Sequence, residues 1–191
     1  MLFRSIYSAR NIGVVGLGGI GMSALLGSIC ESNAKIYAFD INADRLHQAK
    51  SIGANYICNV ANTSPRDFID DLSSGSMLDI VFECSGNISA LNNSLSLINN
   101  SGIIKFASHP KSGELLTIDP FQLILGKRLE GSWGGGINPD RDLNYMARNA
   151  DKNKSFVEYY RSSEYTLDQV NQAIDDLRAG LVLRPILNMY H

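Results

Sequence analysis

A cluster of glycines near the N-terminus constrains the fold of this chain more than any other feature. Val14 and Val15 end a short apolar run, and the next six residues are Gly16, Leu17, Gly18, Gly19, Ile20 and Gly21. The spacing G-x-G-x-x-G between a strand and a helix allows a tight turn, a close approach of the backbone to a pyrophosphate, and close helix packing. The motif therefore predicts a dinucleotide-binding turn, with the helix N-terminus facing the phosphates.

An acidic residue follows the glycines at the distance that such a site needs. Asp40 comes 19 residues after Gly21, at the end of the second expected strand, and Ile41 follows it. A carboxylate there accepts hydrogen bonds from the adenosine ribose hydroxyls and repels a 2′-phosphate. We therefore place Asp40 and Ile41 in the cofactor site and expect NAD (NADH) rather than NADP. The alternative is a plain glycine-rich turn in which Asp40 only caps the next helix.

Short apolar runs alternate with helical patterns along residues 12–131. Strands are expected at 12–15, 35–39, 56–58, 79–83, 103–107 and 128–131, and helices at 20–32, 42–53, 67–72, 90–98 and 120–125. Strands separated by helices favour right-handed βαβ units and a parallel sheet. We predict an α/β fold with a doubly wound parallel sheet, the Rossmann fold, as a domain over residues 1–131 that begins with a lead-in of ten residues.

Residues 132–191 have a different texture and are predicted to form a C-terminal tail. A helix is expected at 140–149, and the capping-box sequence Thr166-Leu-Asp-Gln169 opens another helix that ends at Gly180. A terminal strand is expected at 181–189, where Pro185 would confine it to the edge of a sheet.

Composition and charge exclude several classes of protein. Seventeen basic and nineteen acidic residues give a formal charge of −2, and no cluster of basic residues offers a nucleic-acid-binding surface. No apolar run approaches the roughly 20 residues of a membrane span. We therefore expect neither a nucleic-acid nor a membrane partner.

Cysteine and histidine are too scattered to predict a metal site. The three cysteines form no CxxC pair, and the histidines are equally dispersed: Cys30, Cys58, Cys84, His47, His109 and His191. Buried free thiols in a reducing cytoplasm are the expected interpretation of the cysteines. We predict no metal site within this chain and a cytoplasmic location.

The motifs together resemble the coenzyme-binding domain and C-terminal tail of the medium-chain, zinc-dependent alcohol dehydrogenase family. The resemblance covers residues 11–191, and the segments that carry it are 16–21, 38–45 and 49–54, with support from 79–86 and 129–135. In that family an N-terminal catalytic domain precedes this fold and supplies the zinc ligands. The resemblance thus implies that zinc belongs to a domain missing from this chain.

The resemblance also implies roles for residues beyond the glycine motif. Arg45 would flank the adenosine ribose, and Arg184 would reach the pyrophosphate. The turn after the fourth strand and the loops after the fifth and sixth strands would lie beside the coenzyme, near the nicotinamide: Cys84, Ser85, Gly86, Ala107, Ser108 and Trp133. A short strand at Leu115–Ile118 matches the segment through which family members pair, so a homodimer is expected.

His109 is a candidate catalytic residue. It sits at the expected nicotinamide end, where the family usually has a small or apolar residue. An imidazole there is suited to relaying a proton or to binding a substrate anion. The alternative is a polar loop residue that faces water.

Three hypotheses about function remain open at this point. The chain is the NAD(H)-binding domain of an alcohol or polyol dehydrogenase-like oxidoreductase, in which hydride passes between an alcohol and the nicotinamide. Alternatively it is a stand-alone NAD-binding module or sensor without activity of its own. The third hypothesis is a complete small reductase that works without metal and uses His109 as its proton source.

Overall fold

The computed structural model describes residues 6–73, 76–152 and 163–190. Part of the expected lead-in, at 1–5, and the C-terminal His191 lie outside the described residues. The chain divides into two compact units, the first ending at Gly136 and the second beginning at Ile137. Each unit is described by itself below.

The first unit is built on a six-stranded sheet in the order β3-β2-β1-β4-β5-β6, and every neighbouring pair is parallel. The strands are β1 (Asn11–Val15), β2 (Lys35–Asp40), β3 (Tyr56–Asn59), β4 (Leu78–Glu83), β5 (Ile98–Phe106) and β6 (Arg128–Gly131). The chain leaves β1 in one direction through β2 and β3, and returns to the other side of β1 through β4. This order confirms the predicted doubly wound parallel sheet.

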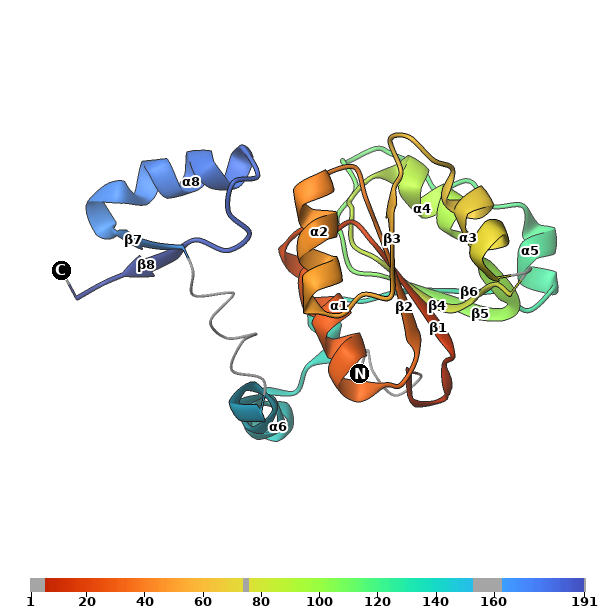
Figure 1. Ribbon diagram of the computed structural model, residues 1–191, viewed down its shortest axis with the longest axis horizontal. Helices are drawn as coiled ribbons and strands as arrows, with labels where there is room; N and C mark the ends of the chain where they lie inside the picture. The colour runs from red at the N-terminus through yellow and green to blue at the C-terminus, as the bar shows by residue number, and fades with distance from the viewer. Residues whose placement is uncertain (1–5, 74–75, 153–162, 191) are drawn as a thin grey trace. The chain divides into compact units, whose positions relative to one another are not determined.

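Helices cover both faces of this sheet. Helices α1 (Gly19–Glu31) and α2 (Ala43–Ile52) lie on one side, and α3 (Pro65–Ser73) and α4 (Ile88–Ser94) lie on the other (Figure 1). A short helix, α5 (Pro120–Ile124), precedes β6, and a 3₁₀ turn (Ile6–Ser8) precedes β1. The central strands β1, β2 and β4 are buried on both faces, which explains why they read as apolar runs. The largest fully buried side chains include Ile12, Leu25, Phe39, Ile69, Leu78 and Phe82.

The ends of α2 are where the sequence predicts them. The side chain of Asn42 accepts a hydrogen bond from the amide of Arg45 at 3.1 Å and so caps the first turn. The helix ends at Gly53, whose φ of 131° is one that other residues rarely adopt. These caps place α2 directly after Asp40.

Helix α4 ends earlier than its sequence pattern indicates. The prediction carried this helix to Ile98, but it ends at Ser94, and Ile98 already begins β5. Leu97 accepts a hydrogen bond from the amide of Leu78 at 2.9 Å, and Ile98 is paired with Leu78 in the sheet. Contacts with β4 therefore hold Leu97 and Ile98 outside the helix, although the sequence pattern assigned both residues to it.

The expected strand at Leu115–Ile118 is not formed. The segment is extended without regular secondary structure: Leu115 is exposed, whereas Leu116 and Ile118 pack against the core. The amide of Thr117 donates to the side chain of Asn92 at 3.2 Å. A strand requires a neighbouring strand, and no described strand of this chain pairs with the segment.

The cysteines correct another expectation. Cys58 is buried and Cys84 is half-buried, but Cys30 is exposed. Cys30 lies in the last turn of α1, beyond the residues of that helix that pack on the sheet. The small and apolar residues next to Cys30 in the sequence therefore did not predict its exposure at the end of the helix.

The second unit holds α6 (Pro139–Lys152), β7 (Glu164–Thr166), a 3₁₀ turn (Leu167–Gln169), α8 (Val170–Arg178) and β8 (Ile186–Asn188). The side chain of Gln169 accepts from the amide of Thr166 at 3.0 Å, as the capping-box sequence predicts. The terminal strand is shorter than expected and begins directly after Pro185. It pairs in parallel with β7 to form a two-stranded sheet.

No helix among the described residues is long and apolar enough to cross a membrane.

Asp79 fastens the amino end of the sheet, and its removal is expected to destabilise the first unit. Its Oδ2 accepts from the amides of Arg10 at 2.7 Å and Asn11 at 3.0 Å, and its Oδ1 accepts from Asn99 Nδ2 at 2.7 Å. Asp79→Leu leaves these donors without their acceptor, which costs about 1–3 kcal/mol of unfolding free energy. Urea denaturation should therefore show a lower midpoint.

The control is Asp71→Ala, which removes an exposed carboxylate of α3. It should change the unfolding free energy by no more than about 0.5 kcal/mol. Equal midpoints for the two variants would show that the Asp79 hydrogen bonds add nothing to stability.

Candidate dinucleotide-binding site

The site lies in the first unit, at the carboxyl ends of the parallel strands. The chain leaves β1 and β4 toward opposite sides of the sheet, so the loops that follow these two strands diverge. Such a switch point is where open α/β sheets bind their ligands. The glycine motif follows β1, and the turn beginning at Cys84 follows β4.

The turn after β1 leaves no room for side chains at two of its glycines. Gly16 has a φ of 82°, and a Cβ atom there would lie 2.6 Å from Cα of Ser85. A Cβ atom on Gly21 would lie 1.7 Å from the carbonyl oxygen of Gly16. In both cases the obstacle is backbone, which has no rotamer to move aside. These two glycines are therefore required by packing.

Gly18 differs, because its surroundings are open. A Cβ atom on Gly18 would meet no described atom within 4 Å. Gly18 is also the N-cap of α1, and this helix has neither a side-chain cap hydrogen bond nor an acidic residue in its first turn. A helix N-terminus without a side-chain cap favours an anion through its dipole. Space and positive potential thus coincide in front of α1.

Asp40 is buried at the end of β2 and already holds two backbone amides. Its Oδ2 accepts from the amide of Leu17 at 2.5 Å, and its Oδ1 accepts from the amide of Asn42 at 2.8 Å. An ionised carboxylate offers about four acceptor positions, so about two remain for a ligand. Asp40 is 7% exposed and the neighbouring Ile41 is 72% exposed. The side chain of Leu17 is fully buried, whereas that of Ile20 is 45% exposed.

Arg45 carries an unsatisfied donor in the helix that follows this carboxylate in the chain. It lies in the first turn of α2, three residues after the Asn42 cap. Its Nε is buried and has no hydrogen-bond partner among the described residues. A buried donor without a partner is unfavourable and is commonly satisfied by a ligand or an ordered water.

A buried carboxylate that the sequence analysis did not single out organises the other half of the site. Glu83 ends β4 and is 1% exposed. Its Oε1 accepts from the amide of Ser85 at 2.9 Å and also from the Ser85 hydroxyl, and its Oε2 accepts from the Ser108 hydroxyl at 2.7 Å. The signal in the sequence was an acidic residue directly after the apolar run Ile80–Phe82.

The turn after β4 and the loop after β5 lie side by side. The amide of Ala107 donates to the carbonyl oxygen of Glu83 at 3.1 Å. Gly86 has a φ of 69°, and a Cβ atom there would lie 3.3 Å from the carbonyl oxygen of His109. Burial, with a smaller contribution from Glu83, raises the pKa of the Cys84 thiol to about 12. Cys84 is therefore a protonated thiol at neutral pH.

His109 and Trp133 meet at the same edge of the sheet. Their rings pack edge to face, with centroids 5.2 Å apart and an interplanar angle of 89°. Both residues are exposed, and the exposed fraction of Trp133 is 82%. The structure thus brings together two residues that follow different strands, β5 and β6.

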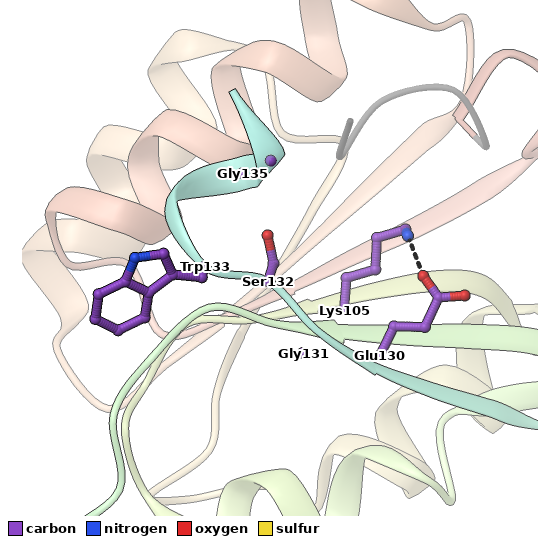
Figure 2. A pocket seen from close by; sticks show the side chains of 7 residues that line it. Lys105, Glu130, Gly131, Ser132, Trp133 and Gly135 are labelled. Carbon is purple, nitrogen blue, oxygen red and sulfur yellow. Dashed lines mark hydrogen bonds and ion pairs between the residues drawn. The ribbon is translucent and has the colours of Figure 1, made fainter. Parts of the chain in front are cut away.

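An open pocket of about 200 Å³ lies beside Trp133. Figure 2 shows the indole on one side of it and the ion pair of Lys105 and Glu130 on the other, with Ser132 between them. Nζ of Lys105 lies 2.6 Å from the carboxylate of Glu130, and the two residues are directly paired across β5 and β6. The pocket is lined mainly by polar side chains and by glycines.

Two further expectations concern Arg184 and a metal site. Arg184 is an exposed residue of the second unit, so its contact with a pyrophosphate stays a prediction. In the part of the chain that the structure describes, no three His, Cys, Asp or Glu side chains gather so as to hold a metal ion.

Comparison with known proteins identifies dehydrogenases as relatives. S-(hydroxymethyl)glutathione dehydrogenase of Komagataella pastoris is 28% identical, over 97% of this chain and 50% of that protein. Alcohol dehydrogenase class-2 isozyme 2 of Oryctolagus cuniculus is 30% identical, over 91% of this chain and 46% of that protein. The chain thus spans about half the length of the curated relatives it matches.

A solved structure supports the same relationship. Benzyl alcohol dehydrogenase from Acinetobacter calcoaceticus superimposes with a TM-score of 0.90 at 27% sequence identity, covering 97% of this chain and 51% of that one. Residues 19–151, more than half of this chain, match the family described as zinc-binding dehydrogenase. The resemblance drawn from the sequence is confirmed, and the chain belongs to the zinc-binding dehydrogenase family.

Proposed function

We propose that this chain is the NAD(H)-binding part of an alcohol or polyol dehydrogenase. The observation that carries the proposal is the open, uncapped N-terminus of α1 at Gly18, at the same edge of the sheet as the buried carboxylate of Asp40. An anion-binding helix end and a ribose-binding acid are the two parts that a dinucleotide requires. The relatives are dehydrogenases, which favours this interpretation over a stand-alone NAD-binding module.

In the proposed complex the adenosine ribose binds the free acceptor positions of Asp40, next to the exposed side chain of Ile41. The N–H group at Nε of Arg45, which has no partner among the described residues, donates to the same nucleotide. The pyrophosphate lies against the backbone of Gly18, Gly19 and Ile20, and a contact from Arg184 stays an expectation drawn from the family resemblance.

The nicotinamide half is proposed to lie across the switch point, against the turn at Cys84, Ser85 and Gly86. The backbone at Ala107 and Ser108 would hold the carboxamide, with Trp133 beside it. A bound nicotinamide supplies hydride chemistry, and the contribution of the chain is to orient the ring and exclude water from one face. His109 stays a candidate for moving a proton at this end.

The described residues do not fit a zinc site, so no step of the reaction is assigned to zinc in this chain. We propose that any catalytic zinc of the whole protein is held by residues outside the described part. The homodimer, the two-domain division of the chain at residue 131 and the cytoplasmic location also stay predictions.

Titration with NADH tests the proposal directly. Trp133 is the sole tryptophan in the sequence and lies at the proposed nicotinamide end, so its emission should change on binding. Saturable binding below about 1 mM NADH, with weaker binding of NADPH, is expected. Failure of the chain to bind NADH at about 1 mM would contradict the proposed function.

Two glycine substitutions should separate ligand binding from packing. Gly18→Ala fills only open space and keeps an ordinary φ of −70°, so stability should be unchanged while the methyl group hinders the pyrophosphate. We expect NADH affinity to fall about tenfold. Gly21→Ala should lower the thermal midpoint because of its backbone clash. The measurements are calorimetric titration and thermal unfolding, and normal NADH binding by Gly18→Ala would contradict the placement of the pyrophosphate.

Asp40→Ala should narrow the preference for NADH over NADPH. The substitution removes both the ribose acceptor and the charge that repels a 2′-phosphate, so NADH affinity falls by about tenfold while NADPH affinity falls less. The ratio of the two dissociation constants is the readout, since loosening of the Leu17 and Asn42 amides affects both cofactors equally.

Asp44→Ala is the matched control for Asp40→Ala. It removes a nearby exposed acid in the first turn of α2. The cofactor ratio should stay as in the wild type, and a shift equal to that of Asp40→Ala would assign the preference to general charge instead of to Asp40.

A further inference from the structure

Glu83 combines deep burial with a position at the candidate site. Its side chain is 1% exposed, and its carboxylate accepts hydrogen bonds from N–H and O–H groups. Among the described residues no cation forms an ion pair with it. A buried ionised carboxylate is costly unless hydrogen bonds replace its water. Hydrogen bonds to a charged acceptor are also stronger than neutral ones. The serines that satisfy Glu83 are therefore held firmly.

The two carboxylate oxygens reach two different segments of the chain. One oxygen holds Ser85 through its amide and its hydroxyl, and the other holds the hydroxyl of Ser108. Ser85 belongs to the turn after β4, and Ser108 belongs to the loop after β5. One side chain thus fixes the spacing of the two loops that face the switch point.

The turn after β4 contacts both the glycine turn and the loop after β5. Ser85 packs directly against Gly16, and Gly86 packs against the carbonyl of His109. Ser85 is exposed and Ser108 is half-buried, whereas Glu83 lies behind them. The serines and the adjoining backbone therefore form the surface that a ligand would touch.

We infer that Glu83 is a positioning residue for the nicotinamide half of the dinucleotide site, acting through Ser85 and Ser108. This inference rests on the proposed function. Asp40 and Arg45 serve the half of the sheet formed by β1 to β3, and Glu83 serves the half formed by β4 to β6. Loss of Glu83 should weaken contacts to the second nucleotide while leaving the adenosine contacts in place.

The test compares NADH with AMP, which occupies only the adenosine half. Glu83→Met removes both acceptors at similar side-chain length. It should weaken NADH binding about tenfold and leave AMP affinity within about twofold, measured by calorimetry for NADH and by ligand-observed NMR for AMP. Parallel losses for both ligands, or no loss for NADH, would overturn the inference.

Asp79→Leu is the matched control for loss of a carboxylate from β4. Asp79 lies near the opposite end of the same strand and also holds backbone amides, at a distance from the site. It should lower stability without changing the ratio of NADH to AMP affinity. An equal change of that ratio in Asp79→Leu would overturn the inference, because general weakening of β4 would then explain both variants.

Glu83→Gln provides a conservative rescue. Glutamine keeps an oxygen for the amide and hydroxyl of Ser85, and its NH₂ group can donate to the Ser108 hydroxyl. NADH affinity within about threefold of the wild type is expected. A loss equal to that of Glu83→Met would contradict an action through these hydrogen bonds.

Ser108→Ala keeps the inference testable if Glu83→Met does not fold. It deletes one arm of the network in a half-buried loop and leaves the backbone in place. NADH affinity should fall about threefold with AMP affinity unchanged, and unchanged affinity for both ligands would overturn the inference. Absence of NADH binding by the wild-type chain is a separate result, which contradicts the proposed function itself.

Discussion

The close approach of three backbone segments at the first glycine turn determines the rest of this site. The carbonyl of Gly16 occupies the space where a side chain of Gly21 would lie, and Ser85 occupies the space next to Gly16. Since each obstacle is main chain, only glycine allows β1, α1 and the turn after β4 to meet. This contact points the N-terminus of α1 at the switch point, where the open space at Gly18 lies.

Acidic residues at strand ends hold neighbouring backbone, with Asp40 and Glu83 at this turn and Asp79 at the opposite end of the sheet. Asp40 holds the amide of Leu17 within the glycine motif, Glu83 holds Ser85, and Asp79 holds the lead-in to β1. Each carboxylate uses acceptor capacity on the protein before any ligand arrives. Asp40 retains acceptor capacity, and Nε of Arg45 in the following helix has no partner among the described residues, whereas Glu83 is enclosed. Similar chemistry therefore supports a contact role for one acid and a positioning role for the other.

Local patterns predicted much of the fold because parallel strands and their helices have distinct periods. The glycine motif, the Asn42 cap and the end of α2 at Gly53 all follow from residues close together in the chain. Leu97 and Ile98 did not, because an apolar pair suits either a helix or a strand until β4 provides a partner. The segment Leu115–Ile118 forms no strand here, since no described strand of this chain pairs with it, and its pairing with a second copy stays a prediction.

The bridge from Glu83 to Ser108 was beyond sequence reasoning because the two residues are 25 positions apart and meet only through the register of β4 and β5. The two halves of the sheet contribute different groups to the candidate site. Around β1 and β2, Asp40 accepts from the Leu17 amide and Nε of Arg45 has no partner among the described residues, and we propose that the identity of the nucleotide is read there. Around β4 and β5, the buried Glu83 holds Ser85 and Ser108, and we propose that the backbone and small residues there face the ligand. On this proposal, selection of the cofactor and orientation of its nicotinamide ring depend on different residues, so substitutions in one set are expected to leave the other property unchanged.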